Sequence, residues 1–286
     1  MNILVTGSAG MIGSSLVKAL LKNGFSVIGV DTNNACFEGC YTHYAIDLSS
    51  NNLLKQIFEK EHIDRVIHLA ALAHTSKGNK YPKSLYNHIN VNCSNNVFKM
   101  ASSFEVPVLF ASTVDVYGFQ KNTVNVNTHC RPVTIYGKTK YKAEELLINS
   151  GCSYSIFRFS PVYSDEIKRD IQKRYYLSYP NWAYLIGKGM SYEVLNIELA
   201  VDSMINWCYL QPKNDICIIK DSQLLETKKC VEIERKEHRA KHILHFPRWL
   251  FCCFYGIARI TGRNKYTFLL NKAIHPLRSE WNGITQ

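Results

Sequence analysis

The chain has 286 residues, of which 46% are hydrophobic and 20% are charged. That balance is typical of a folded globular protein, and a chain of this length buries a sufficient core without disulfides. The formal net charge of +11 is concentrated in residues 228–278, which hold twelve basic and three acidic residues. This segment could attract an anionic substrate, contact anionic lipid or form a solvated basic face. Nucleic acid is not expected as a partner, because no stacking motif or recognition helix accompanies the charge.

The ten cysteines have no spacing that predicts a disulfide framework or a zinc site. We therefore expect buried thiols in a reducing cytoplasm and no metal. Met1 leads directly into an apolar run without the basic region of a signal peptide. The most apolar later stretch, Ile243 to Gly262, contains Pro247, Arg248 and Arg259, which argues against a spanning helix. The expectation is a cytoplasmic protein with no transmembrane segment.

Short apolar runs alternate with helical patterns over the first two-thirds of the chain. The runs lack strict alternation, which is typical of strands that are buried on both faces of a parallel sheet. The intervening segments have apolar residues at helical intervals. This order predicts an α/β fold with a doubly wound parallel sheet, a Rossmann domain over residues 1–164 and a smaller, intimately packed substrate lobe over 165–286. Expected strands are Asn2–Thr6, Ser26–Val30, Arg65–Leu69, Val106–Ala111 and Tyr154–Phe159, and expected helices are Gly13–Lys22, Asn51–Lys60, Tyr86–Ser102 and Thr139–Asn149.

Beyond about Pro161 the alternation ends. Residues 168–184 are basic and aromatic, and we expect them to form a loop or helix over the mouth of the site. Helices are expected at Ile197–Leu210 and Arg248–Ile260, with a strand at Ile216–Ile219.

A glycine-rich turn follows the first predicted strand and precedes the first predicted helix. Such a turn lets the backbone approach a pyrophosphate, and the free N–H groups of the helix attract the negative charge. The strand–turn–helix context makes the spacing informative. The residues expected to hold the dinucleotide here are Gly7, Gly10, Met11, Ile12 and Gly13.

Asp31 ends the second predicted strand, where a carboxylate would accept hydrogen bonds from ribose hydroxyls. A 2′-phosphate would be repelled there, and no arginine follows to compensate. NAD(H) is therefore favoured, and NADP(H) stays as the alternative.

Tyr136 and Lys140 are one helical turn apart, so they share a face. A phenol has a pKa near 10, and we expect the neighbouring ammonium to lower that pKa so that the phenol can transfer a proton at pH 7. Ser112 and Thr113 follow the fourth expected strand, where a hydroxyl could bond the same substrate oxygen.

Together these residues resemble the extended short-chain dehydrogenase/reductase superfamily, in its NAD-dependent epimerase/dehydratase group, over residues 2 to about 164. The resemblance implies a catalytic triad of Thr113, Tyr136 and Lys140, with the last two also contacting the cofactor. It also implies a homodimer through the helices at Tyr86–Ser102 and Thr139–Asn149. Further cofactor contacts implied by the resemblance are Asp47, Leu48, Leu69, Ala70, Ala71 and Asn90.

Three activities share this family scaffold: 4-epimerases, 4,6-dehydratases and 4-ketoreductases of nucleotide-diphosphate sugars. Dehydratases carry an acidic pair or a lone Glu after the catalytic Thr, whereas this chain has Val114 and Asp115, which disfavours dehydration. Pro161 replaces an Asn that reaches the substrate diphosphate, as in the ketoreductase branch. The leading interpretation is therefore an NAD(P)H-dependent 4-ketoreductase for O-antigen sugar synthesis, with an NAD-dependent 4-epimerase as the alternative. A cofactor-binding sensor or scaffold without catalysis is the non-enzymatic alternative, and the presence of all three catalytic residues disfavours it.

Candidate substrate contacts come from three separate parts of the sequence. Asp115 could face the sugar, and a histidine and threonine after the third strand could touch sugar or nicotinamide. Basic residues of the mouth segment could bind the diphosphate that Pro161 cannot, because guanidinium geometry suits phosphate. The candidates are His74, Thr75, Asp115, Arg169 and Arg174, with Lys173 beside them.

Overall fold

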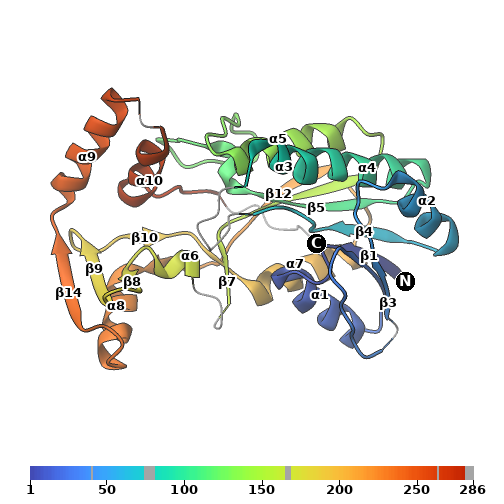
Figure 1. Ribbon diagram of the computed structural model, residues 1–286, viewed down its shortest axis with the longest axis horizontal. Helices are drawn as coiled ribbons and strands as arrows, with labels where there is room; N and C mark the ends of the chain where they lie inside the picture. Colours follow the sequence, from blue (N-terminus) through green and yellow to red (C-terminus); the bar gives the residue numbers. More distant parts are fainter. Residues whose placement is uncertain (40, 74–80, 165–168, 263, 281–286) are drawn as a thin grey trace.

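The computed structural model describes the chain except for residues 40, 74–80, 165–168, 263 and 281–286. A seven-stranded parallel sheet forms the larger part of the molecule (Figure 1), in the order β12-β6-β5-β4-β1-β2-β3. This order confirms the predicted doubly wound fold. Its strands are β1 (Asn2–Thr6), β2 (Ser26–Asp31), β3 (Tyr41–Ala45), β4 (Arg65–His68), β5 (Val108–Thr113), β6 (Tyr154–Phe159) and β12 (Asp215–Ile219).

Helices cover both faces of the sheet, as Figure 1 shows. On one face α1 (Met11–Lys22) packs with α7 (Ile197–Tyr209), and their apolar residues share one buried cluster with β1 and β5. On the other face a second cluster joins the sheet to α2, α4 and α5. The elements on that side are α2 (Asn51–Lys60), α3 (Lys83–Asn87), the π-helical turn η1 (His88–Cys93), α4 (Ser94–Ser103), the 3₁₀ turn η2 (Val114–Tyr117) and α5 (Ile135–Ile148).

Helix α5 begins at Ile135, four residues before the predicted start. Thr134 caps it, because its Oγ1 accepts a hydrogen bond from the N–H of Gly137 at 2.9 Å. Tyr136 therefore belongs to the first turn of the helix, one turn before Lys140. The edge strand β3 was not predicted, because its sequence Tyr-Thr-His-Tyr-Ala is polar and only half-buried.

The remaining elements form a smaller lobe beside the carboxyl ends of the sheet strands. Helices α9 and α10 lie side by side at its outer end (Figure 1). The mouth segment contains only a short helix and strands instead of one continuous element. The lobe elements are β7 (Val162–Tyr163), α6 (Arg169–Gln172), β8 (Tyr176–Leu177), β9 (Trp182–Ile186), β10 (Ser191–Tyr192), β11 (Leu195–Asn196), β13 (Leu225–Glu226), α8 (Thr227–Lys236), β14 (His242–Phe246), α9 (Arg248–Ile260) and α10 (Asn264–Ile274).

The chain crosses between the two parts more often than a single boundary at residue 164 allows. After β7 to β10 it returns to the sheet through α7 and β12, and β12 pairs with β6 in parallel over Asp215–Ile219. The apolar face of α7 fixes this return, since it packs directly on α1. Among the described residues, no helix has the length and apolar content needed to cross a bilayer.

The expectation of buried thiols holds for only part of the set. Five of the described cysteines are buried, but Cys36, Cys252 and Cys253 are exposed. The last two are adjacent on α9, which presents them to solvent.

Candidate active site

A cleft of about 1670 Å³ lies between the carboxyl ends of the sheet strands and the lobe. One wall contains the glycine-rich turn, the end of β5 and the start of α5. The opposite wall comes from the lobe and includes residues of α9 and α10. The cleft brings together Gly7, Gly10, Met11, Ile12, Gly13, Leu69, Ala71, Thr113, Asp115, Tyr136, Lys140, Pro161 and Arg174.

The glycine-rich turn has space only for glycine at its critical positions. Gly7 has φ +73°, and a Cβ there would meet the backbone N of Ala70 at 2.8 Å. A Cβ on Gly13 would overlap the carbonyl oxygen of Gly7. Gly10 is the N-cap of α1 with extended backbone and no side-chain cap, and the first residues of the helix, Met11, Ile12 and Gly13, line the cleft. This cradle fits the pyrophosphate of a dinucleotide.

Asp31 lies beside that turn. Its Oδ2 accepts a hydrogen bond from the N–H of Ala9 at 3.2 Å, and its Oδ1 accepts one from Asn33 at 3.0 Å. Asp47 and Leu48 lie farther along the same edge of the sheet and do not line the cleft. A hydrogen bond from the backbone of Ser49 lowers the pKa of Asp47. These positions are compatible with ribose and adenine contacts to a bound cofactor.

Asn90 braces the loop that follows β4. Its Oδ1 accepts from the N–H of Leu72 at 2.6 Å, and its Nδ2 donates to the Leu72 carbonyl at 3.1 Å. The same amide donates to Thr139 of α5 at 3.0 Å. Asn90 thus joins the loop with Leu69, Ala70 and Ala71 to the helix that carries the catalytic candidates, although its own side chain is buried outside the cleft.

The three catalytic candidates all line the cleft. Thr113 ends β5 and caps η2, where its Oγ1 accepts from the N–H of Asp115 at 3.2 Å. Tyr136 and Lys140 reach the same cleft from α5. The neighbouring hydroxyl of Ser112 instead donates to the carboxylate of Glu144. Of the two hydroxyls, Thr113 is therefore the one available to a substrate.

Lys140 is a buried amine with unusual electrostatics. Only 1% of its surface is exposed, and its Nζ lies 3.9 Å from the centroid of the Phe110 ring. Burial lowers its pKa to about 7, against the opposing attraction of Glu144. Phe110 also stacks on the buried His68, whose pKa burial lowers to about 3 and which therefore stays neutral.

The expected lowering of the Tyr136 pKa by Lys140 does not occur. Burial, and then the negative charge of Asp115, raises the pKa of Tyr136 above its usual value. Helical spacing does not indicate how far the phenol is removed from water, and the desolvation of the phenolate is the largest cause of the shift in its pKa. Tyr136 is thus a protonated phenol at neutral pH in the absence of ligand.

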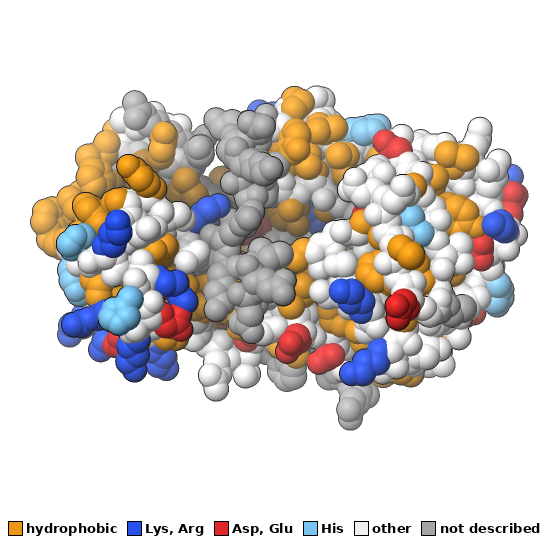
Figure 2. Space-filling model, turned by 60° about the horizontal axis from the view of Figure 1, so that its bottom comes forward, with side chains coloured by type: hydrophobic (Ala, Val, Ile, Leu, Met, Phe, Trp, Pro, Cys, Tyr) orange, Lys and Arg blue, Asp and Glu red, His pale blue; other side chains and the backbone are white. Residues whose placement is uncertain are grey.

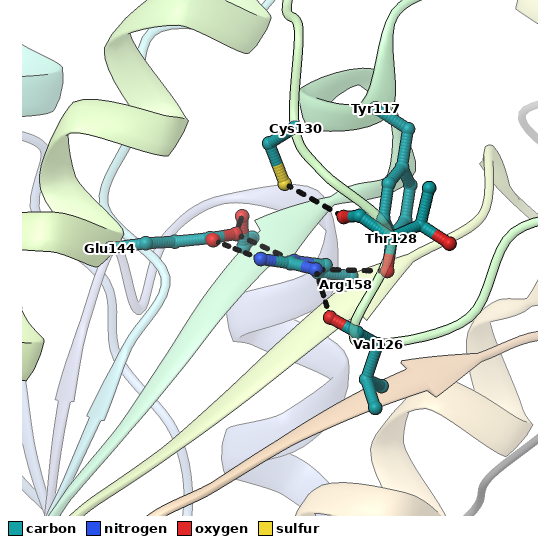
Figure 3. Close-up of polar contacts among 7 residues, drawn as sticks. Tyr117, Val126, Thr128, Cys130, Glu144 and Arg158 are labelled. Carbon is teal, nitrogen blue, oxygen red and sulfur yellow. Dashed lines mark hydrogen bonds and ion pairs between the residues drawn. The ribbon is translucent and has the colours of Figure 1, made fainter. Parts of the chain in front are cut away.

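A buried ion pair lies behind the catalytic helix (Figure 3). Arg158 of β6 donates from Nη2 to Oε2 of Glu144 at 2.7 Å and from Nε to Oε1 at 3.2 Å. Its Nη1 donates to the Tyr117 hydroxyl at 2.8 Å. The pair fixes α5, which bears Tyr136 and Lys140, to β6 and to the segment that follows Thr113 at the end of β5. No sequence signal had indicated this pair.

Asp115 is tied to the lobe. Its Oδ1 lies 2.6 Å from the Nζ of Lys272 in α10, 157 residues away in sequence. Both side chains line the cleft. Sequence analysis missed Lys272, because no local pattern distinguishes it from the other C-terminal cations.

The remaining substrate candidates have mixed outcomes. His74 and Thr75 lie outside the described residues. Arg169 begins α6, and its side chain also lies outside what the structure describes. Arg174 lines the cleft, with its guanidinium carbon 4.4 Å from the centroid of the Tyr192 ring.

One trio of potential metal ligands occurs in the described part of the chain, where the sequence had indicated none. Ligand atoms of Asp47, His88 and Cys93 lie within 4.8 Å of one another. Burial and Asp47 raise the pKa of the Cys93 thiol to about 11, which opposes the thiolate that a metal needs. We assign no metal to this trio.

About half of the chain is similar in sequence to known proteins. The "Bifunctional protein GAL10" of Pachysolen tannophilus is 32% identical over 162 residues, or 51% of this chain and 23% of that protein. The UDP-glucose 4-epimerase of Drosophila melanogaster is 31% identical over 167 residues, or 51% of this chain and 47% of its own length. The chain thus spans less than half the length of these relatives.

Solved structures share the fold over most of the chain. The UDP-glucuronic acid 4-epimerase from Bacillus cereus in complex with NAD has a TM-score of 0.71 at 21% identity, covering 86% of this chain and 89% of that one. The family model described as the NAD dependent epimerase/dehydratase family matches residues 3–196. That match includes the glycine-rich turn and all three catalytic candidates, and the chain therefore belongs to the NAD dependent epimerase/dehydratase family.

Proposed function

We propose that this chain is an NAD-dependent 4-epimerase of nucleotide-activated sugars. The observation that carries the proposal is that Thr113, Tyr136 and Lys140 line the same cleft as the glycine-rich turn. The Drosophila relative is named as an epimerase of UDP-glucose, and this supports 4-epimerisation over the ketoreductase that the sequence alone favoured.

Each residue has a distinct task at the sugar O4 atom. Bound NAD supplies the hydride acceptor and donor for the carbinol carbon. Tyr136 takes the hydroxyl proton during oxidation and returns it during reduction. Thr113 holds the same oxygen by a hydrogen bond. Lys140 supplies the positive charge one helical turn away that stabilises the phenolate when the cofactor and substrate displace water.

The substrate diphosphate requires cations, and the cleft offers them from the lobe. Arg174 lines the cleft, as does Lys173. Guanidinium groups bind phosphate oxygens in a fixed fork geometry. We propose that Arg174 takes the place of the amide donor that Pro161 cannot provide, and that the apolar residues of α9 and α10 cover the nucleotide or sugar.

A 4-ketoreductase is the second candidate, and Pro161 is the observation that favours it. This proline lines the cleft at the position where the sequence resembles the ketoreductase branch. A protonated Tyr136 is the acid that reduction of a ketone requires. In that case the product would serve O-antigen sugar synthesis.

One experiment separates the two candidates. Purified protein is incubated with catalytic NAD⁺ and UDP-glucose or UDP-galactose, and the sugars are resolved by chromatography while absorbance at 340 nm is recorded. Epimerisation gives interconversion of the two hexoses without net absorbance change. Stoichiometric NADH consumption with a 4-keto-6-deoxy nucleotide sugar, and no interconversion, would establish the reductase instead.

Tyr136→Phe tests the proton transfer in either case. We expect kcat to fall by 10²-fold or more, because a positioned acid–base group contributes roughly that factor. NAD binding, followed by fluorescence quenching, should change little. Unchanged turnover in this variant would remove Tyr136 from the mechanism.

A further inference from the structure

Helix α9 is apolar on two opposite faces. One face lines the cleft with Phe251, Phe254 and Ala258. The opposite face carries residues spaced at three, four, seven and eleven positions, which a helix aligns in one stripe. This outer stripe consists of Trp249, Cys252, Cys253, Gly256 and Ile260.

The outer stripe is open to solvent. Trp249 is 65% exposed and Ile260 is 87% exposed. Cys252 and Cys253 are exposed as well, and a Cβ added at Gly256 would meet no atom within 4 Å. A contiguous apolar stripe with an aromatic residue is typical of an interaction surface, because single exposed apolar residues are common but aligned ones are not.

Basic side chains accompany the stripe at the same end of the lobe, where apolar and basic residues lie next to one another (Figure 2). Exposed cations lie on α8, on the segment that leads to β14, and in the last turn of α9. Some cations of this end are paired, namely Lys229 with Glu226, and Arg239 with Glu234 and Glu237. The others form no ion pair with any residue that the structure describes: Lys228, Arg235, Lys236, Lys241 and Arg259. Glu232 is the exposed carboxylate that offsets part of this charge.

We propose that the end of the lobe formed by α8, β14 and α9 docks on the surface of an anionic phospholipid membrane. An interfacial helix binds lipid through a tryptophan-bearing apolar face, and neighbouring lysines and arginines bind acidic headgroups. Helix α9 has 13 residues, too few to span the bilayer, so it lies in the interface.

Charge complementarity selects the membrane over a second copy of the chain. A two-fold dimer through this end would place the five cations named above opposite the same cations of its partner. Like charges in such an interface are unfavourable. Acidic headgroups neutralise them instead.

Vesicle binding of the full chain tests the proposal. We expect cosedimentation with vesicles of equal phosphatidylglycerol and phosphatidylcholine, weaker binding at 0.5 M salt, and none with pure phosphatidylcholine. Trp249→Ser/Ile260→Ser should weaken the partition coefficient at least tenfold, because each side chain loses its apolar transfer into the interface. The matched control, Leu53→Ser/Tyr209→Ser, removes two exposed apolar side chains from the sheet domain and should bind as the wild type does.

A second variant tests the electrostatic half separately. Lys236→Gln/Lys241→Gln should weaken binding about 25-fold, since one cation near the surface contributes roughly a fivefold factor. Its control is Lys18→Gln/Lys99→Gln, which removes the same charge from the sheet domain. Thermal unfolding of all four variants should match that of the wild type, because every substituted side chain is exposed.

Cysteine alkylation gives a residue-specific readout. Bound vesicles should slow the reaction of Cys252 and Cys253 with a water-soluble maleimide, while exposed Cys36 on the sheet domain reacts at its original rate. Equal binding to neutral vesicles, unchanged binding of either lobe variant, or equal alkylation with and without vesicles would overturn the proposal. A dimer that dissociates on Trp249→Ser/Ile260→Ser without any vesicle binding would overturn it in favour of self-association.

Discussion

Replacing Lys140 by methionine should stabilise the protein while abolishing its activity. The amine is almost completely buried, and its pKa falls from the ordinary 10.5 to about 7. That difference corresponds to about 5 kcal/mol of cost for the charged form in the folded state. Methionine fills a similar volume without a charge, so the expected gain is up to about 5 kcal/mol.

The gain has a defined pH dependence. The folded-state pKa of Lys140 is depressed, so the unfolded chain holds one more proton than the folded chain between about pH 7 and 10.5. The penalty on the wild type is therefore complete below pH 7 and disappears as pH rises towards 10.5. We expect Lys140→Met to exceed the wild type by up to about 5 kcal/mol at pH 6 and by about 1 kcal/mol at pH 10.

Thermal unfolding at several pH values measures this difference. For a chain of this size about 5 kcal/mol corresponds to an increase in Tm of about 10–20 °C. Lys138→Met is the matched control, because Lys138 is exposed on the same helix and its loss should leave Tm within about 2 °C. A Lys140→Met protein that is less stable than the wild type, or equally stabilised at pH 6 and pH 10, would refute the assignment of a buried, desolvated amine.

Three further variants test the neighbouring structure. Gly13→Ala should weaken NAD binding at least tenfold in a fluorescence titration, because its Cβ overlaps the Gly7 carbonyl and displaces the phosphate-binding turn; wild-type affinity would contradict the fit of the turn. Glu144→Gln should lower the free energy of unfolding by about 3–5 kcal/mol in urea, since it leaves Arg158 buried without its counter-charge. The double variant Glu144→Gln/Arg158→Met should recover most of that loss, and failure to recover would show that the pair is not the cause. Lys272→Met should move the limb of the pH–rate profile that reports the ionisation of Tyr136 to higher pH, because an uncompensated Asp115 raises the pKa of Tyr136 further; an unchanged profile would exclude that coupling.

Local sequence patterns were sufficient for the inner strands of the sheet and for the glycine-rich wall of the cleft. The strands at Asn2–Thr6 and Tyr154–Phe159 have the predicted bounds, because both carry apolar residues that are buried within the parallel sheet. The glycine-rich turn was also predictable, since the positive φ of Gly7 and the close contacts of Gly7 and Gly13 leave no room for a side chain at these positions. Each of these features depends on residues that are close together in the sequence.

The opposite wall of the cleft was not predictable in the same way. The contact between Asp115 and Lys272 joins residues 157 apart, and the exposed stripe on α9 depends on which side of that helix faces the cleft. Apolar periodicity identified α9 as a helix. It could not indicate that one apolar face lines the cleft while the opposite apolar face is exposed to solvent. The expected boundary at residue 164 also left out the return of the chain to the sheet at β12. This return depends on the pairing of β12 with β6, which is a tertiary contact that local sequence does not indicate.

Lys140 and Arg158 are buried cations near the cleft, and tertiary contacts determine the pKa of each. Lys140 and Glu144 are one turn apart on α5, and spacing alone would pair them with each other. The structure instead pairs Glu144 with Arg158, at 2.7 Å. Burial lowers the pKa of Arg158 and the hydrogen bonds to Glu144 raise it, with a net increase that keeps the guanidinium charged. Burial lowers the pKa of Lys140 to about 7, and the charge of Glu144 raises it only in part. If Glu144 bound Lys140 directly, the amine would be held more firmly in its charged form, and Arg158 would be left buried without its counter-charge.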